Sequence, residues 1–391
     1  MRNPLSKTIT TIQPSGIRKF FDIVHEMKDA ISLGVGEPDF DTPWHIRDEG
    51  IYSLEKGRTF YTSNAGLKEL KIEIDKYLKR RFGVSYDYNN EIMVTVGGSE
   101  AIDIAMRAML DPGDEVLIPQ PSYVSYLPCC VLANGTPVII ELKAENQFRL
   151  TPEELEAAIT PKTKLLVLPF PNNPTGAIME KEDLEKIADI VKKYDLFVLS
   201  DEIYSELTYT GDNHVTIASL PGMKERTITL NGFSKAYSMT GWRLGYAACN
   251  EEIVKTVNKL HQHVVTCATS FVQKAGVVAL KEEKNEVTDM VKEYQRRRDY
   301  AVKAINEIDG LSCRCPKGAF YIFINIEKLG MTGQEFAPLL LENAKVALVP
   351  GDVFGTEGDH YVRMSFANSY ENVVEGCKRL KEFVEKLRRN K

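Results

Sequence analysis

The 391-residue chain has the composition of an ordinary globular protein with two or three domains, since 43% of its residues are hydrophobic and 27% are charged. It carries 49 Lys and Arg against 55 Asp and Glu, and the resulting net charge of −6 argues against a nucleic-acid-binding surface. No apolar run is long enough to cross a bilayer, and the first residues lack a secretory signal pattern. We therefore expect a cytoplasmic protein with neither nucleic acid nor a membrane as partner.

Cysteine and histidine patterns give no metal or disulfide signature. The seven cysteines include no C-x-x-C pair and are expected to be reduced thiols. His261 and His263 are separated by one residue, and we expect both on the surface. The sequence therefore predicts no metal site.

The predicted elements begin with a short helix and continue with alternating strands and helices. Ile17, Phe20 and Val24 recur at helical spacing after Ser15, a residue type that caps helices. Seven apolar, strand-like runs follow, at residues 92–96, 115–118, 138–142, 165–168, 196–199, 227–230 and 245–249. Helical patterns lie between several of them, at 100–110, 152–159 and 181–194. This alternation predicts an α/β fold with a buried, mainly parallel seven-stranded sheet wrapped by helices.

The C-terminal part of the chain has a different pattern. Residues 251–308 are expected to form long helices, with Arg296, Arg297 and Arg298 on a solvated face. Short strands are predicted at 319–323, 346–349 and 361–366, and a closing helix from residue 369 to the end. We predict a large domain of residues 46–285 and a smaller α+β domain built from both chain ends, residues 1–45 and 286–391.

Four polar segments follow predicted strands, where parallel-sheet proteins place their ligands. Gly97-Gly98-Ser99-Glu100 precedes a helix, and its amides would suit an anion, with Ser99 as a possible cap. The other segments contain Asn173, Asp201 and Lys235. Each segment also has a purely structural explanation, as a strand–helix connection, a turn or a helix cap. The residues that accompany Lys235 favour a catalytic role for it: Ser234 precedes it, Arg243 follows eight residues later, and the sheet supplies an acid.

The order of the motifs along the chain is more specific than any one of them. The motifs are Asn173-Pro174-Thr175-Gly176, Asp201-Glu202-x-Tyr204, Ser234-Lys235 and Gly241-x-Arg243-x-Gly245. This set resembles the pyridoxal-phosphate enzymes of fold type I, and within them the class I/II aminotransferases of the aspartate and aromatic aminotransferase superfamily. The resemblance extends from residue 15 to residue 363, and it is strongest to the broad-specificity aromatic aminotransferases of archaea and bacteria.

The resemblance implies roles for the residues around the cofactor ring. Lys235 would bond to the aldehyde of pyridoxal 5'-phosphate and later move the substrate's Cα proton, for which its amine must be neutral. Asp201 would pair with the pyridine nitrogen and keep it protonated, which makes the ring an electron sink. Tyr204 and Asn173 would donate hydrogen bonds to the phenolic oxygen, and Tyr123 would stack on the ring.

The resemblance also implies how phosphate and substrate are held. The phosphate ligands would be the backbone at Gly98, Ser99 and Glu100, the Ser234 hydroxyl and Arg243. Tyr61 matches a tyrosine that reaches the phosphate of the neighbouring subunit, which implies a homodimer with shared active sites. Arg363 would take the substrate α-carboxylate in a two-pronged hydrogen-bonded pair, and Gly36 and Asn173 would line the same pocket.

The implied reaction moves the amino group of an L-amino acid to a 2-oxo acid, with 2-oxoglutarate as the expected acceptor, in a ping-pong sequence. Aromatic or broad neutral amino acids are favoured as substrates, because no second arginine is evident for a distal carboxylate. Two alternatives stay open at this point: an aspartate-type aminotransferase, and a pyridoxal-phosphate-dependent carbon–sulfur β-lyase on the same scaffold.

Overall fold

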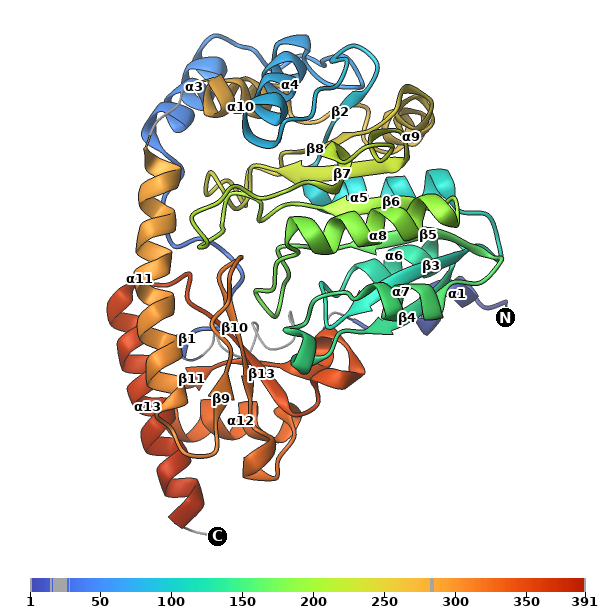
Figure 1. Ribbon diagram of the computed structural model, residues 1–391. Helices are drawn as coiled ribbons and strands as arrows, with labels where there is room; N and C mark the ends of the chain where they lie inside the picture. The colour runs from blue at the N-terminus through green and yellow to red at the C-terminus, as the bar shows by residue number, and fades with distance from the viewer. Residues whose placement is uncertain (1, 15, 17–26, 28, 282–284, 390–391) are drawn as a thin grey trace.

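The computed structural model describes residues 2–14, 16, 27, 29–281 and 285–389. The predicted N-terminal helix after Ser15 lies outside these residues. Within them the chain forms a seven-stranded sheet, a four-stranded sheet and a two-stranded sheet, each flanked by helices (Figure 1). No helix of the described residues is long and apolar enough to span a bilayer.

The seven-stranded sheet has the order β2-β8-β7-β6-β5-β3-β4. Of these seven strands, β8 alone runs opposite to the other six, so the prediction of a mainly parallel seven-stranded sheet is confirmed. The strands are β2 (Ile92–Thr95), β3 (Glu115–Gln120), β4 (Thr136–Glu141), β5 (Thr163–Leu168), β6 (Phe197–Asp201), β7 (Thr227–Gly232) and β8 (Gly245–Ala248).

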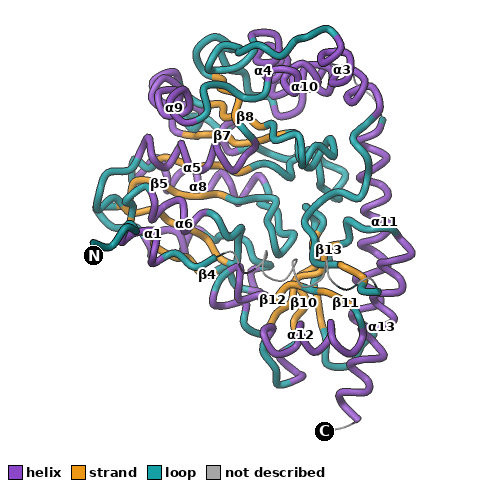
Figure 2. The backbone as a smooth tube through the Cα atoms, turned by 180° about the vertical axis from the view of Figure 1, so that it is seen from behind, coloured by secondary structure: helices purple, strands orange, loops and turns teal. Residues whose placement is uncertain are grey.

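Helices cover both faces of this sheet because alternate strand residues point to opposite sides. Leu165 and Val167 of β5 pack against α5 (Gly97–Met109), α6 (Tyr126–Leu132) and α9 (Glu251–Val264). Leu166 and Leu168 pack on the other face, against α7 (Pro152–Ala158) and α8 (Lys181–Lys193). The latter two helices lie in front of the sheet in Figure 1, and Figure 2 shows the opposite side.

A third helical layer closes the β2–β8 end of the sheet. It consists of α3 (Trp44–Glu55), α4 (Lys68–Phe82) and α10 (Ser270–Lys281), at the top of Figure 1. The remaining short helices are α1 (Lys7–Thr11), η1 (Ala144–Asn146), η2 (Ile217–Ser219), η3 (Lys224–Arg226), η4 (Glu327–Leu329), η5 (Gly351–Phe354) and η6 (Thr356–Gly358).

The C-terminal part forms an antiparallel four-stranded sheet in the order β12-β13-β10-β9, below the large sheet in Figure 1. Its strands are β9 (Ser312–Cys313), β10 (Tyr321–Asn325), β12 (Val349–Pro350) and β13 (Tyr361–Ser365). Helices α11 (Glu286–Asn306), α12 (Gly333–Ala344) and α13 (Tyr370–Arg389) pack around it. The N-terminal segment joins this region, because β1 (Ile31–Ser32) pairs in parallel with β11 (Val346–Ala347).

The prediction of a solvated face for the arginine run of α11 is wrong for two of its three members. Arg297 and Arg298 are only 5% and 7% exposed. Arg297 donates to Asp39 Oδ1 at 2.7 Å and to Glu293 Oε1 at 2.9 Å. The ion pair with Asp39 ties α11 to the N-terminal segment, a contact between distant parts of the chain that charge patterning alone does not reveal.

Candidate active site

Lys235 and Asp201 come from neighbouring parallel strands. Asp201 is the last residue of β6, and Lys235 follows the end of β7 by three residues. Because β6 and β7 are parallel, their carboxyl ends lie at the same edge of the sheet. From there the Lys235 ammonium donates a 2.6 Å hydrogen bond to the carbonyl of Gly36, in the N-terminal segment. A side chain at Gly36 would meet the Tyr321 hydroxyl at 2.5 Å, so this crossing requires glycine.

The surroundings of Lys235 favour a neutral amine. Burial lowers the pKa of Lys235 to about 8, against an upward effect of the Glu37 carboxylate. The positive charges of Arg363 and Arg243 also lower the pKa of Lys235. A lysine whose pKa lies this close to neutrality has an appreciable neutral fraction, which is the form that can act as nucleophile or base.

Asp201 is a half-buried acid whose charge is supported by hydrogen bonds. Tyr126 donates to its Oδ2 at 2.7 Å, and the Ile203 amide donates to Oδ1 at 3.2 Å. Burial raises the pKa of Asp201, and the Tyr126 hydrogen bond opposes that rise. Sequence reasoning missed Tyr126, although it follows Tyr123 by three residues. The rings of Tyr123 and Tyr126 pack edge to face with their centroids 5.7 Å apart, and Tyr123 is half-buried.

Tyr204 and Asn173 lie at the same edge, but each has a partner that the sequence did not suggest. The Tyr204 hydroxyl lies 2.9 Å from the hydroxyl of Tyr321. The Asn173 side-chain oxygen accepts a hydrogen bond from Arg363 at 2.8 Å. Tyr321 was missed because it stands within an apolar run that predicts a strand, where an aromatic residue signals core packing.

Arg363 is the most completely enclosed charge of the site. Only 1% of Arg363 is exposed. Its Nη2 donates a hydrogen bond to the Gly34 carbonyl at 2.6 Å. Its guanidinium lies over the rings of Tyr321 and Phe354, at 4.3 and 4.8 Å from their centroids. Its Nε has no partner, and no carboxylate of the described ranges forms an ion pair with it. Burial lowers the pKa of Arg363, so an incoming carboxylate would supply the missing countercharge.

The N-terminus of α5 forms the opposite end of the site. Gly97 has φ +74°, and a side chain there would meet the Arg243 guanidinium at 2.6 Å. A side chain at Gly245 would meet the Gly97 backbone at 2.6 Å, so two glycines permit this approach. Ser234, the residue before Lys235, is buried. Arg243 is exposed, and its guanidinium donates a hydrogen bond to the Thr240 carbonyl at 3.0 Å.

Two predictions about this end are wrong in detail. The helix begins at Gly97 after Val96, so Ser99 lies inside the first turn, exposed, and does not cap it. His261 is fully buried, because α9 packs on α5 and brings its Nδ1 to 2.7 Å from Glu100 Oε1. Glu100 also accepts from the Val96 amide. No side chain caps the start of α5, and Glu100 instead joins the Val96 amide to His261, with Gly98 half-buried beside it.

Tyr61, like Ser99 and Arg243, is a predicted site residue that the single chain leaves exposed. It is 85% exposed, and the adjacent Phe60 is 83% exposed.

Comparisons with known proteins show the family to which the chain belongs. The model of the family described as aminotransferase class I and II matches residues 28–380. The chain is 47% identical to an aspartate aminotransferase of Pyrococcus abyssi and 45% identical to aromatic-amino-acid aminotransferase 2 of Thermococcus litoralis, with 97% of each chain covered in both cases. It also resembles the crystal structure of an aromatic aminotransferase from Pyrococcus horikoshii, with a TM-score of 0.90 and 46% identity over 94% of this chain and 99% of that one.

Proposed function

Since the chain belongs to the class I and II aminotransferase family and is an aminotransferase, we propose that Lys235, Asp201 and Arg363 carry out its reaction with pyridoxal 5'-phosphate. The observation that carries this proposal is the meeting of three groups from distant parts of the chain. A lysine of lowered pKa and a half-buried acid share one sheet edge, and Arg363, which has no carboxylate partner among the described residues, lies close enough to help lower the pKa of that lysine.

The residues present fit the cofactor. Asp201 is a half-buried acid whose pKa is raised by desolvation, and a protonated ring nitrogen would supply a positive charge that stabilises its carboxylate. The glycine-lined start of α5, with the Arg243 guanidinium against Gly97, suits a phosphate. Gly98, Ser99, Glu100 and Ser234 are proposed to complete the phosphate site. When bound, the cofactor supplies an electron-poor ring that stabilises negative charge at the substrate Cα.

The chain's own residues would bind, orient and move a proton. Arg363 holds the substrate carboxylate, and Asn173 and the Gly34 carbonyl fix the plane of its guanidinium beforehand. Lys235 in its neutral form takes the Cα proton and returns one at the end of the half-reaction. The Tyr204 hydroxyl is proposed to donate a hydrogen bond to the cofactor's phenolic oxygen. The Tyr123 ring is proposed to stack on the cofactor ring.

The substrate side chain is proposed to be aromatic or neutral. Both an aspartate and an aromatic aminotransferase stand among the relatives, so the family leaves this point open. Two features favour the aromatic assignment. The Arg363 guanidinium is faced by the rings of Tyr321 and Phe354, and Glu37 acts on Lys235 as a negative charge that would oppose a second substrate carboxylate.

The test is a single-turnover screen of the cofactor-loaded enzyme with phenylalanine, tyrosine, leucine and aspartate, measuring the 2-oxo acid formed and then its reversal by 2-oxoglutarate. We expect the aromatic amino acids to have the highest kcat/KM. A higher value for aspartate would favour the dicarboxylate alternative. Pyruvate and a free thiol released from a cysteine thioether, without amino transfer, would favour the β-lyase.

The enzyme is further proposed to be a cytoplasmic homodimer in which Tyr61 reaches the partner's phosphate site. Support comes from the exposed apolar side chains of residues 44–61, which include Trp44, Tyr52, Leu54, Phe60 and Tyr61. The test mixes inactive Lys235→Ala subunits with Tyr61→Ala subunits. A hybrid dimer would hold one site with both native residues, so activity should return on mixing. Failure to recover activity, with hybrids shown by mass, would contradict the shared site.

A further inference from the structure

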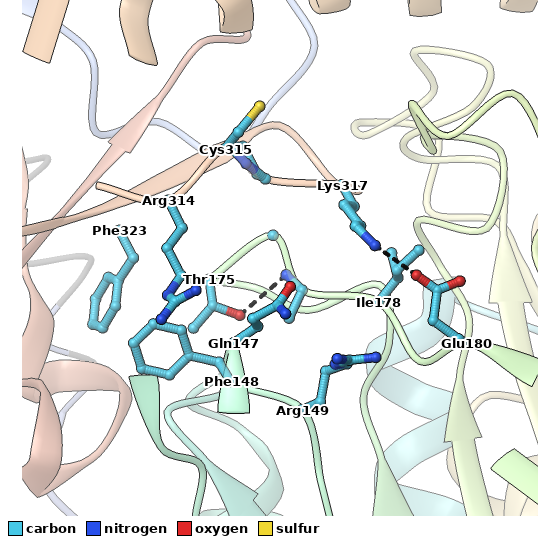
Figure 3. Close-up of a pocket in the computed structure, with 13 residues that line it drawn as sticks. Gln147, Phe148, Arg149, Thr175, Ile178, Glu180, Arg314, Cys315, Lys317 and Phe323 are labelled. Atoms are coloured by element: carbon cyan, nitrogen blue, oxygen red, sulfur yellow. Dashed lines mark hydrogen bonds and ion pairs between the residues drawn. The ribbon is translucent and has the colours of Figure 1, made fainter. Parts of the chain in front are cut away.

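A cavity of about 230 Å³ lies between the large and small sheets, away from Lys235. One wall consists of residues 147–149 and 175–180, from the loops around α7 and before α8. The other wall consists of residues 314–317, between β9 and β10, together with Phe323 of β10. Neither Lys235, Asp201 nor Arg363 lines it, so it is a separate cavity (Figure 3).

The two walls are held together by backbone hydrogen bonds. The amides of Lys317 and Gly318 donate to the Gly176 carbonyl at 3.0 and 2.9 Å. The Lys317 ammonium also pairs with Glu180 across the cavity at 2.6 Å. Because these bonds join loops from the two sheets, the cavity has fixed walls and is largely formed before any ligand binds.

The charges on the walls are mainly positive. Arg149, Arg314 and Lys317 line the cavity, against the single carboxylate of Glu180. Arg149 is paired with Asp183 at 2.8 Å, and Lys317 is paired with Glu180. Arg314 has no ion pair within the part of the chain that the structure describes, and it is exposed. Figure 3 shows its side chain extending from the small-sheet wall toward Phe148 and Gln147 of the opposite wall.

The apolar part of the cavity is aromatic. Phe148 and Phe323 come from opposite walls, and their rings pack edge to face at 5.8 Å. Rings and a free guanidinium on the same cavity suit a flat apolar molecule that ends in an anionic group, since the guanidinium can hold a carboxylate by two hydrogen bonds. The volume is below the range of about 300–1,000 Å³ that is usual for drug-sized ligands, so it suits a molecule of about one ring.

We propose that this cavity binds a small aromatic carboxylate, with the carboxylate on Arg314 and the ring packed against the Phe148–Phe323 pair. The site lies outside the one where the substrate reacts, so it is a second binding site for an organic anion. Phe323 stands directly opposite Arg363 in the β10–β13 ladder, and binding here must therefore be distinguished from binding at Arg363.

The test is calorimetric titration of the cofactor-loaded enzyme with sodium benzoate. We expect Arg314→Ala to weaken benzoate binding at the cavity about tenfold and Arg314→Glu to abolish it, because a hydrogen-bonded charge is removed or reversed. Arg389→Ala, which removes an exposed arginine of α13, is the matched control and should leave binding unchanged. Both positions are exposed, and circular dichroism confirms that the three variants are folded.

Arg363→Lys separates the two sites. Benzoate bound in the cavity should survive Arg363→Lys and be lost with Arg314→Glu, whereas benzoate bound at the substrate site should show the reverse. Benzylamine, which has the same ring with a cationic group, should not bind in the cavity. Benzoate binding that is indifferent to both Arg314 variants, or no binding at all by the wild-type enzyme, would overturn the proposal.

Discussion

Arg363 and Arg243 stand at the two ends of the candidate site, and the chain completes their surroundings to very different degrees. Arg363 is 1% exposed, bonded to Asn173 and Gly34, and covered by two aromatic rings. Arg243 is exposed and has one hydrogen bond, to the carbonyl of Thr240. The proposed substrate end is thus enclosed within one chain, while the proposed phosphate end is left open in the single chain.

The difference has an energetic consequence. A buried guanidinium that lacks a countercharge is costly, and a substrate carboxylate relieves that cost when it binds. An exposed guanidinium is already hydrated, so each phosphate contact there contributes less by itself. We therefore expect substitutions at the enclosed end to affect catalysis more than those at the open end.

The largest effect is expected for Lys235→Ala, which removes the group that both ends serve. The variant should still bind the cofactor through phosphate contacts but lose transamination by about 10⁴-fold or more, because both covalent attachment and proton transfer depend on this amine. Borohydride reduction of the wild-type holoenzyme followed by peptide mapping should label Lys235. A label on another lysine would refute the assignment.

Arg363→Lys tests the enclosed end directly. Truncating one partner of a buried, hydrogen-bonded charge pair costs about 2–5 kcal/mol, so kcat/KM should fall between about thirtyfold and several thousandfold. The matching decarboxylated amine, which has no carboxylate to bind, should be a poor substrate of both enzymes. If the variant stays close to the wild type on the amino acid, Arg363 does not hold the carboxylate.

The pH dependence of cofactor capture tests the environment of Lys235. Its pKa is lowered to about 8, so the neutral amine accumulates above that pH, and its fraction rises about tenfold between pH 7 and pH 9. Capture of pyridoxal 5'-phosphate by the cofactor-free enzyme, followed by absorbance, should rise with the same midpoint. A midpoint near the ordinary lysine value would show that burial does not lower this pKa.

Tyr126→Phe should have a smaller effect, because it removes one hydrogen bond to Asp201 and keeps the ring. A hydrogen bond to a charged group contributes about 1.5–3 kcal/mol, and we expect a loss of about tenfold in kcat with the fold intact. Tyr123→Phe is the matched control, because the described residues give its hydroxyl no hydrogen-bond partner. Equal losses in both variants would argue against a specific role of the Tyr126 hydroxyl.

The sequence by itself determined the mainly parallel sheet and the order of motifs along it. Strands such as 196–199 and 227–230 are short, mostly apolar runs followed at once by polar residues, and this local pattern depends only on burial. Placing Asp201 and Lys235 at one sheet edge needed only the parallel order of β6 and β7. The resemblance to a family supplied the expected roles, which no single motif carries.

Only the tertiary structure decided which groups surround these residues. Tyr126 on Asp201, Tyr321 on Tyr204 and His261 on Glu100 are contacts between segments about 75, 117 and 161 residues apart in the chain. Tyr126 and Tyr321 stand on apolar elements, where the sequence signal of core packing hides that of a polar contact. His261 stands on the amphipathic helix α9, where its polar neighbours indicate a surface position instead. Local patterning records whether a residue is buried, whereas the partner it meets depends on how distant elements pack.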